Sequence, residues 1–248
     1  MHPVLIEIGP FTVYTYGFFI AAAFLAGMAW AMHEAGQRNL DPRTISDVGF
    51  YVIVSAILGS RLLYVIINPR YFLEHPLEIL MFWKGGLVFL GGAILATLTV
   101  LYYFRSKQMS VWPWADCFAP ALALGQAVGR LGCLAAGCCF GKECTLPWAV
   151  TFSDERSLAP LNLALHPTQI YHSLAGLLTF GIILGFKKHV KRDGQLIALF
   201  FMLYAVFRFS IEFFRNDYRG DFGALSLTQV IALMVLLAGA ALFIKRRT

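Results

Sequence analysis

Charged side chains are scarce in this sequence. Asp, Glu, Lys and Arg make up 14% of its 248 residues, whereas an ordinary soluble domain carries about 25%. Hydrophobic residues account for 58% of the chain, so the polar side chains are too few to cover one soluble domain of this size. This shortage excludes a soluble domain, a disordered chain and a small disulfide-stapled secreted protein. A polytopic membrane protein remains.

The N-terminal segment lacks the positive charge that a signal peptide carries before its apolar core. Glu7 is the only charged residue before Gly17, so we expect the first apolar segment to remain as a membrane span. The basic residues also lack the clustering on one face that is typical of a nucleic-acid-binding protein. They lie instead in short pieces between apolar runs, and we expect no nucleic-acid partner.

Long uncharged windows predict an all-α polytopic membrane protein with about seven transmembrane helices. The expected spans are 14–32, 47–68, 85–104, 115–137, 167–186, 194–214 and 222–244. The chain, 1–248, would then form a single transmembrane domain. We find no internal repeat, which disfavours a transporter built from two inverted halves.

Lys and Arg are unevenly distributed between the predicted loops. The loops after the first, third, fifth and last windows carry most of them, so the positive-inside rule places the N-terminus outside and the C-terminus in the cytoplasm. The longest loop, 138–166, would form a small outer cap, and the stretch 148–152 suggests a strand pair in it. We expect segment 76–83 to form a helix lying at the outer interface.

Apart from Asp47, the first residue of its window, five charged residues fall inside the predicted spans, where each costs about 2.5 to 3.5 kcal/mol unless it is paired or hydrated. They are Arg61, Asp116, Arg130, Arg208 and Glu212. In a structural interpretation, Asp116 neutralises an arginine and Arg208 pairs with Glu212 one helical turn later. Because three arginines face two acids, at least one cation needs another partner. A lipid phosphate suits it, since a guanidinium binds phosphate oxygens through two parallel hydrogen bonds.

Glycines surround Arg130 in the fourth predicted span. They are Gly125, Gly129, Gly132, Gly137 and Gly141. Small residues in a membrane often permit close helix packing, but they can equally leave room for a lipid headgroup, and their density favours the second interpretation. The pairs Gly85-Gly86 and Gly91-Gly92 likewise predict backbone that lies close to a ligand or to a neighbouring helix.

Seven ordered motifs over nearly the whole chain resemble those of the prolipoprotein diacylglyceryl transferase family. They are Tyr16-Gly17, Gly59-Ser60-Arg61, the GGLVFLGG stretch at 85–92, Asp116, Gly129-Arg130-Leu131-Gly132 with Gly137 and Gly141, the HPTQIY stretch at 166–171, and the pattern of Tyr204, Arg208, Phe209, Glu212 and Arg215.

The resemblance implies a diacylglyceryl transfer from phosphatidylglycerol to the lipobox cysteine of a preprolipoprotein signal peptide. The reaction would take place in the lipid bilayer of the bacterial inner membrane, forming a thioether and releasing glycerol phosphate, without a cofactor or metal. Arg130 would stabilise the departing phosphate, and Arg208 would hold a lipid or orient the substrate.

The resemblance also implies the remaining site residues. Glu212 and Asp116 would keep the arginines in place, while Tyr16 and Tyr204 would donate hydrogen bonds to the headgroup. The other substrate-binding positions would be Gly129, Gly132, Gly137, Gly141 and Arg215.

Four positions depart from the residues that are usual in the family. Leu90 stands where a His, a candidate general base, is usual, and Cys133, Cys138 and His172 replace one Asn and two Glu. The proton of the substrate thiol must then go elsewhere, and His166 and His172 titrate in a suitable range. His166 could instead only cap the fifth span. A base is dispensable if the thiol ionises as the phosphate leaves.

Four of the five cysteines lie close together in the sequence. They are Cys133, Cys138, Cys139 and Cys144. The chain has no C-x-x-C pair and no nearby His at a suitable spacing, so the spacing does not predict a zinc site. On the oxidising side of a membrane, a disulfide from Cys138 or Cys139 to Cys144 is expected.

Two other functions remain open from the residues alone. The cysteine cluster at 133–144 raises the hypothesis of a membrane thiol oxidoreductase, which would need two mobile cysteine pairs. The departures at the four family positions raise another, a lipid-binding relative that is inactive or has a different substrate.

Overall fold

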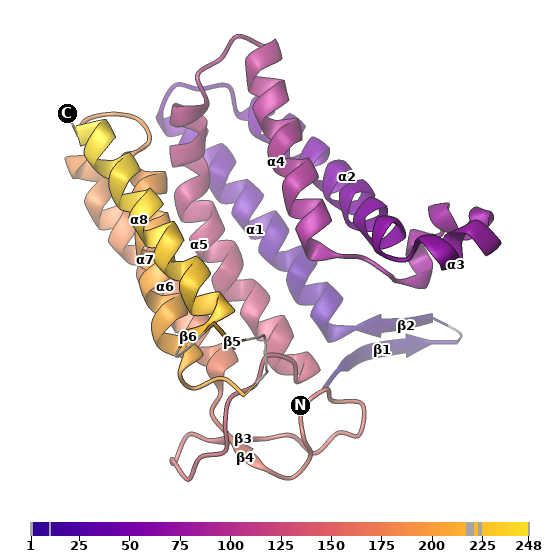
Figure 1. Cartoon of the computed structure of the whole chain (residues 1–248). Helices are drawn as coiled ribbons and strands as arrows, with labels where there is room; N and C mark the ends of the chain where they lie inside the picture. Colours follow the sequence, from indigo (N-terminus) through magenta and orange to yellow (C-terminus); the bar gives the residue numbers. More distant parts are fainter. Residues whose placement is uncertain (1, 10, 217–220, 223–224, 248) are drawn as a thin grey trace. The chain divides into compact units, whose positions relative to one another are not determined.

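The computed structural model describes residues 2–9, 11–216, 221–222 and 225–247 (Figure 1). In this part of the chain, seven helices are long and apolar enough to cross a membrane, which confirms the predicted all-α polytopic class. They are α1 Thr15–Gln37, α2 Pro42–Ile67, α4 Phe89–Ser106, α5 Val111–Ala136, α6 Thr168–Phe186, α7 Gln195–Glu212 and α8 Leu227–Arg247.

The chain divides into two compact units. The first comprises Met1–Ala31 and Ala115–Thr248, and the second comprises Met32–Trp114. Each unit has its own internal packing and is described separately. The expected single transmembrane domain stays a prediction.

In the second unit, the helix α4 begins later than predicted. Gly85 and Gly86 have φ angles of 86° and 69°, so helical backbone is interrupted there and α4 starts only at Phe89. The single interfacial helix predicted over 76–83 is also wrong in form. The chain makes a short helix α3, Pro69–Glu74, followed by two 3₁₀ turns, η1 Pro76–Leu80 and η2 Phe82–Lys84.

Arg61 organises this irregular segment. Its guanidinium donates hydrogen bonds to the carbonyls of Ile79 at 3.0 Å, Gly85 at 2.7 Å and Gly86 at 3.3 Å, and to that of Glu78. The side chain is buried. One of the three intramembrane arginines is therefore satisfied by backbone and has a structural role.

The pairing of α2 with α4 uses the glycines of both helices. A Cβ atom at Gly59 would overlap the carbonyl of Gly91, and one at Gly92 would come within 2.7 Å of the Ala56 carbonyl. The backbones therefore touch, as small residues permit in membrane helices. At Gly91-Gly92, the close neighbour is a helix.

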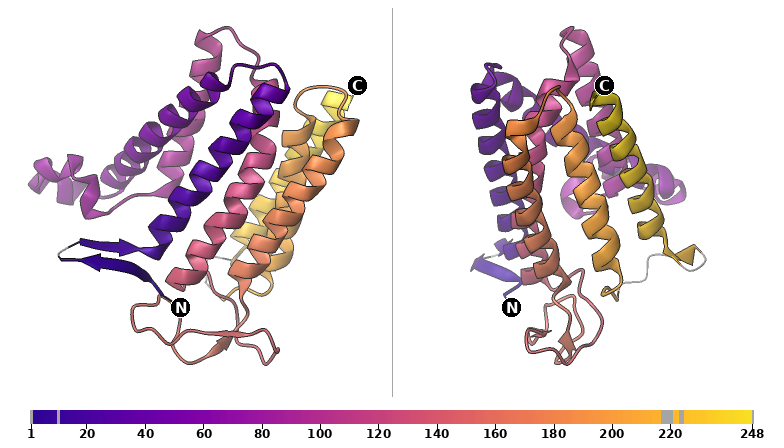
Figure 2. Two further views of the ribbon diagram at one scale, coloured as in Figure 1. Left: turned by 180° about the vertical axis from the view of Figure 1, so that it is seen from behind. Right: turned by 90° about the vertical axis from the view of Figure 1, so that its left-hand side faces the viewer.

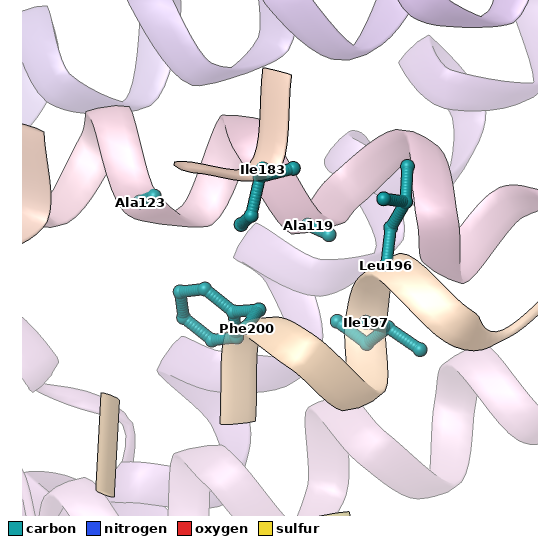
Figure 3. Packing of buried hydrophobic residues seen from close by; sticks show 6 residues of the cluster. All are labelled: Ala119, Ala123, Ile183, Leu196, Ile197 and Phe200. Carbon is teal, nitrogen blue, oxygen red and sulfur yellow. The ribbon is translucent and has the colours of Figure 1, made fainter. Parts of the chain in front are cut away.

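In the first unit, α5, α6 and α7 share a hydrophobic core (Figure 3). Ala119 and Ala123 of α5 meet Ile183 of α6 and Leu196 and Phe200 of α7. The helices α6, α7 and α8 lie side by side (Figure 1). This packing fixes the positions of α5, which carries Arg130, and of α7, which carries Arg208 and Glu212.

Asp116 ties α5 to the beginning of α7. Its carboxylate is fully buried and accepts hydrogen bonds from the backbone N–H groups of Gly194 at 2.8 Å and Ile197 at 2.9 Å. It thereby satisfies donors that a helix N-terminus leaves without partners. Arg130 lies about 21 Å further along the same helix, at 1.5 Å per residue. The printed contacts of its carboxylate are those of a helix cap, and the expectation that Asp116 holds one of the arginines in place stays a prediction.

The loop between α5 and α6 contains the predicted strand pair. β3, Val150–Thr151, pairs antiparallel with β4, Ala164–Leu165, over a small core of Phe152, Ala159 and Leu165. Another pair, β5 Asp221–Phe222 and β6 Leu225–Ser226, precedes α8, which explains why α8 begins at Leu227 and not at the predicted residue 222.

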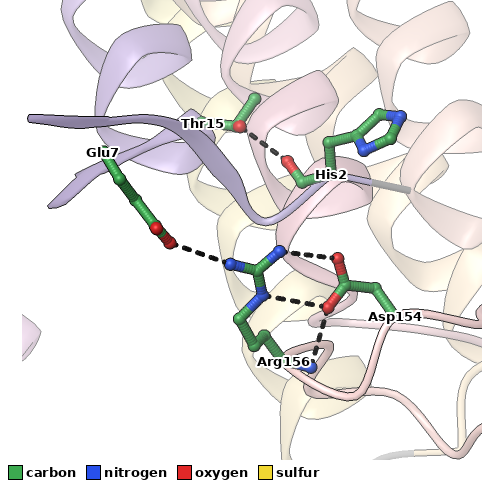
Figure 4. Close-up of polar contacts among 5 residues, drawn as sticks. All are labelled: His2, Glu7, Thr15, Asp154 and Arg156. Atoms are coloured by element: carbon green, nitrogen blue, oxygen red, sulfur yellow. Dashed lines mark hydrogen bonds and ion pairs between the residues drawn. The ribbon is translucent and has the colours of Figure 1, made fainter.

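An N-terminal hairpin was not predicted. β1, Val4–Ile8, pairs with β2, Phe11–Tyr14. Arg156 of the loop reaches this hairpin, with Nη1 3.0 Å from Oε1 of Glu7 (Figure 4). Arg156 also donates hydrogen bonds to Asp154, which lower the pKa of that partly exposed carboxyl. Within the first unit, the hairpin and the α5–α6 loop lie at one end and the C-terminus at the other (Figure 2).

Candidate functional site

The last turn of α7 and the residues after it carry a buried charge network. Nη1 of Arg208 lies 2.7 Å from Oε2 of Glu212, which confirms the predicted pairing, and Nε of Arg215 lies 3.7 Å from the same oxygen. Oε2 is off the direction of the N–H bonds, so this attraction is chiefly electrostatic. The hydroxyl of Ser226 donates to the other oxygen of Glu212 at 3.2 Å. Two guanidiniums therefore share one carboxylate.

His172 of α6 adjoins this network. Its Nε2 lies 3.4 Å from Nη1 of Arg208, and the side chain is 1% exposed. Because a guanidinium has no acceptor, this nitrogen must accept, and the imidazole is neutral with its proton on Nδ1. The charges of Arg130, Arg208 and Arg215 all reach the ring. A proton added here would create a fourth cation, so His172 is suited to positioning Arg208 and poorly suited to acting as a base.

Arg130 lies on α5, partly exposed. No hydrogen bond or ion pair joins its guanidinium to another residue in the described part of the chain. Its charge nevertheless reaches Tyr16, Cys133, His172 and Arg208. Arg130 is therefore a cation beside the charge network with its hydrogen-bond donors available to an anion.

Two tyrosines lie beside these arginines. Tyr16, in the first turn of α1, is 43% exposed and interacts electrostatically with Arg130. Tyr204 precedes Arg208 by one turn of α7 and interacts with it in the same way, while its ring stacks on Phe200 with centroids 6.1 Å apart. Hydrogen bonds from these two hydroxyls to a ligand stay a prediction.

His166 occupies a different environment. Its Nδ1 lies 3.1 Å from the hydroxyl of Tyr171, which also accepts a hydrogen bond from Trp148 Nε1 at 2.9 Å. The ring packs on Phe214. Its main-chain carbonyl accepts a hydrogen bond at 2.8 Å from the N–H of Thr168, the first residue of α6, which agrees with the alternative that His166 caps this helix. The described contacts of its ring are with aromatic residues and not with the arginines.

The glycines of the fourth span mostly abut protein atoms. A Cβ at Gly132 would lie 2.9 Å from Cβ of Phe19 in α1, and one at Gly141 would lie 2.5 Å from Cβ of His166. At Gly137 a Cβ would overlap the hydroxyl of Ser157. Close packing therefore explains these three glycines, and the expected room for a headgroup is absent at them. Gly129 is less crowded, with its nearest neighbour Ile20 at 3.7 Å.

The cysteines differ from the expectation. All five are free thiols, so the predicted disulfide to Cys144 is wrong. Cys133, Cys138 and Cys139 instead converge, with their Sγ atoms within 4.8 Å of one another. We call these three residues the thiol trio. The chain reverses after α5 through left-handed backbone at Gly137, with φ of 73°, and this reversal brings the later two cysteines back to the first.

The thiol trio is electrically coupled to the arginines. Hydrogen bonds from the thiols of Cys133 and Cys138, followed by the charge of Arg215, lower the pKa of Cys139. The same contacts with Cys133 and Cys139 raise the pKa of Cys138. The contacts among the three thiols thus act on Cys138 and Cys139 in opposite directions. The closeness of these cysteines in the sequence was a signal, but their spacing, C-x₄-C-C, matches no familiar ligand pattern.

A cavity of about 260 Å³ lies in the second unit, lined by Arg61, Tyr64, Phe72 and Gly85 among others. Its arginine already donates to backbone carbonyls, so the cavity offers no available cation. Arg130 and the network around Glu212 remain the candidate site.

The family model described as prolipoprotein diacylglyceryl transferase matches residues 3–245. The chain belongs to this family. Among its relatives is the phosphatidylglycerol–prolipoprotein diacylglyceryl transferase of Clostridium tetani, 35% identical over 98% of this chain and 97% of the relative. The enzyme of the same name from Bordetella avium is 36% identical over 98% and 93%, and that from Trichormus variabilis is 34% identical over 99% and 91%.

Four residues of this chain differ from those usual in the prolipoprotein diacylglyceryl transferase family, and the structure shows where they lie. Cys133 and Cys138 belong to the thiol trio, and His172 contacts Arg208. Leu90 lies in α4 of the second unit and is 60% exposed. In this member, three of the four unusual residues thus take part in the arginine and thiol cluster of the first unit.

Proposed function

We propose that this protein transfers a diacylglyceryl group from phosphatidylglycerol to the cysteine thiol in the lipobox of a prolipoprotein signal peptide. The products are a thioether-linked lipoprotein precursor and glycerol phosphate. The observation that carries the proposal is Arg130, a partly exposed guanidinium within a span, without a hydrogen bond or ion pair to protein among the described residues, beside a buried network in which two further arginines share Glu212.

The chemistry follows from where charge develops. As the sulfur attacks the glyceryl carbon, the C–O bond to phosphate breaks and the leaving phosphate gains negative charge. The N–H groups of Arg130 donate hydrogen bonds to the phosphate and stabilise this negative charge. The interaction is strong because the surroundings have a low dielectric constant. Arg208, held by Glu212 and His172, keeps the surrounding potential positive and orients the lipid. Tyr16 and Tyr204 donate hydrogen bonds to the headgroup, and Arg215 and Gly129 line the same site.

The setting of the reaction is the bacterial inner membrane, in which the protein is a multi-pass component. Both substrates reach the site from the bilayer, because a phospholipid and a signal peptide are each membrane-embedded. The strand-bearing loop 138–166 faces the outer side, where a prolipoprotein presents its lipobox, and the C-terminus faces the cytoplasm.

A mass-spectrometric transfer assay tests the proposal. Purified protein in detergent is mixed with phosphatidylglycerol and a lipobox peptide, and the peptide is expected to gain the mass of a diacylglyceryl group on its cysteine. The same peptide with Ser in place of Cys is expected to gain nothing. A failure of the cysteine peptide to gain this mass under all lipid and detergent conditions contradicts the transferase function.

Arg130→Ala is expected to slow the transfer by about 100- to 1,000-fold, the usual loss when a group that stabilises a developing oxyanion is removed. Arg130→Lys is expected to be intermediate, since an ammonium keeps the charge but loses the two-pronged hydrogen bonding. Arg105→Ala, at the exposed end of α4, is the matched control. Equal rates for Arg130→Ala and Arg105→Ala would remove Arg130 from the mechanism.

A further inference from the structure

The thiol trio has the dimensions of a metal site. Its three Sγ atoms lie within 4.8 Å of one another. Sulfurs bound to one zinc ion at about 2.3 Å lie about 3.8 to 4.0 Å apart. The three thiols therefore need only a small inward movement to share an ion. Thiolate ligands select soft metals, among which zinc is common in proteins.

The backbone holds the thiol trio in place without a metal. The N–H of Cys138 donates to the carbonyl of Cys133 at 3.1 Å. The carbonyl of Cys138 accepts from Nε2 of Gln169 at 2.8 Å, and that of Cys139 accepts from the hydroxyl of Thr168 at 2.6 Å. Both donor side chains are fully buried. Such second contacts orient ligands and strengthen metal sites.

The backbone of Cys139 also has a positive φ, 61°, which is uncommon for a residue with a side chain. A glycine would adopt this conformation more easily, yet the position carries a thiol that points to the other two. The conformation is thus used to deliver a sulfur to the cluster.

The charges around the thiol trio suit a zinc–thiolate group. A zinc ion with three thiolates carries one net negative charge, and Arg130 and Arg215 interact electrostatically with Cys133 and Cys139. The guanidiniums therefore compensate the group. All three cysteines are partly exposed, so a bound ion would be open to a further ligand from outside.

We propose that Cys133, Cys138 and Cys139 bind one zinc ion, and that the open fourth position binds the thiol of the substrate cysteine. The second half of this proposal rests on the proposed transferase function. Catalytic zinc sites keep three protein ligands and one open position, and a thiol that coordinates zinc loses its proton.

The resulting step balances. The substrate thiol releases its proton to water when it binds the metal. Its sulfur then attacks the glyceryl carbon, the S–C bond forms and the C–O bond breaks, and the phosphate leaves with the bonding electrons. Zinc does not change its oxidation state. This route activates the thiol in a chain that has Leu90 where a histidine base is usual in the family.

Metal content tests the first half of the proposal. The purified full-length protein is charged with zinc chloride, freed of loose metal by gel filtration and analysed by mass spectrometry of elements. We expect one zinc ion per chain. In Cys133→Ser and in Cys139→Ser, the affinity for zinc is expected to fall by about 10-fold or more. Cys144→Ser, outside the thiol trio, is expected to bind as the unaltered protein does.

Two results would overturn the metal site. One is zinc binding by the unaltered protein no stronger than that of the triple variant with Cys133, Cys138 and Cys139 all changed to Ser. The other is recovery of two of the three cysteines as a disulfide, so that after denaturation without reductant only one cysteine of the trio reacts with maleimide. Thermal unfolding in detergent shows whether each variant folds. If Cys133→Ser does not fold, Cys139→Ser is used in its place.

Cobalt substitution tests the open position without requiring turnover. A cobalt ion bound by thiolates absorbs in the near ultraviolet through sulfur-to-metal charge transfer. Adding a lipobox peptide is expected to increase this absorption, whereas the Cys→Ser peptide is expected to leave it unchanged. An unchanged spectrum with the cysteine peptide rejects substrate binding at the metal.

The two proposals fail in different ways. Full transfer activity in the chelated protein and in the triple variant overturns the role of zinc and leaves the transferase function standing. A cobalt spectrum that responds to the peptide, combined with no transfer, supports the metal site and overturns the transferase function.

Discussion

At the scale of single residues, the site is defined by how each intramembrane charge is satisfied. Arg61 donates to carbonyls, Asp116 accepts from the start of α7, and Arg208 shares Glu212 with Arg215. Arg130 alone among these has no such partner in the described residues. Because a charge in a membrane is costly unless it is paired or hydrated, this exception is the position at which we propose that a ligand binds.

Glu212 is expected to be a principal support of this site. Changing Glu212→Ala leaves Arg208 and Arg215 buried without their shared carboxylate, and removing one partner from a buried pair costs about 3 to 5 kcal/mol. Thermal unfolding in detergent should therefore occur at a clearly lower temperature.

The double change Arg208→Met with Glu212→Leu provides the comparison. Apolar residues of similar volume often replace a buried ion pair without loss of stability, so the double variant should unfold later than Glu212→Ala while it transfers poorly. Unfolding of Glu212→Ala at the temperature of the unaltered protein would show that the carboxylate does not hold the arginines.

At the scale of elements, the apolar windows predicted all seven long helices because length and charge are local properties of the chain. The predicted starts of two helices were wrong because a turn or a strand pair precedes them. The helix α4 begins after Gly85 and Gly86, whose φ angles are positive, and α8 begins after the short strand pair β5–β6. The thiol trio was missed for a similar reason. Its ligands meet through a reversal after Gly137 that no spacing rule encodes.

Asp116 gives an element-scale prediction. Asp116→Ala deprives the buried N–H groups of Gly194 and Ile197 of their acceptor, and unsatisfied buried donors cost about 1 to 3 kcal/mol. Asp116→Asn keeps one acceptor oxygen and should lose less. The free energy of unfolding in detergent measures both, with Asp154→Ala in the exposed loop as the control. Equal stability of the Asp116→Ala and Asp154→Ala variants would contradict the capping role.

At the scale of the whole molecule, the distribution of Lys and Arg predicts which side of the membrane each loop faces. The seven spans place the two ends of the chain on opposite sides. We predict that the loop 138–166 faces outward, the side on which lipid would be transferred to an exported protein.

Reporter fusions test this orientation. Alkaline phosphatase, which is active only outside the cytoplasm, is fused after Glu155 or after Lys188. We expect activity at Glu155 and none at Lys188, with the opposite result for a fluorescent protein that folds in the cytoplasm. The reverse pattern would invert the predicted topology.

The contacts of Arg61 have a consequence for how this protein tolerates change. Its guanidinium binds the main-chain carbonyls of Glu78, Ile79, Gly85 and Gly86, and main-chain groups are common to all amino acids. Most side chains between residues 78 and 84 can therefore be exchanged without altering the path of the segment. The path of the segment is held largely by Arg61, a residue of α2. Substitutions are therefore expected to be tolerated in the segment but not at Arg61.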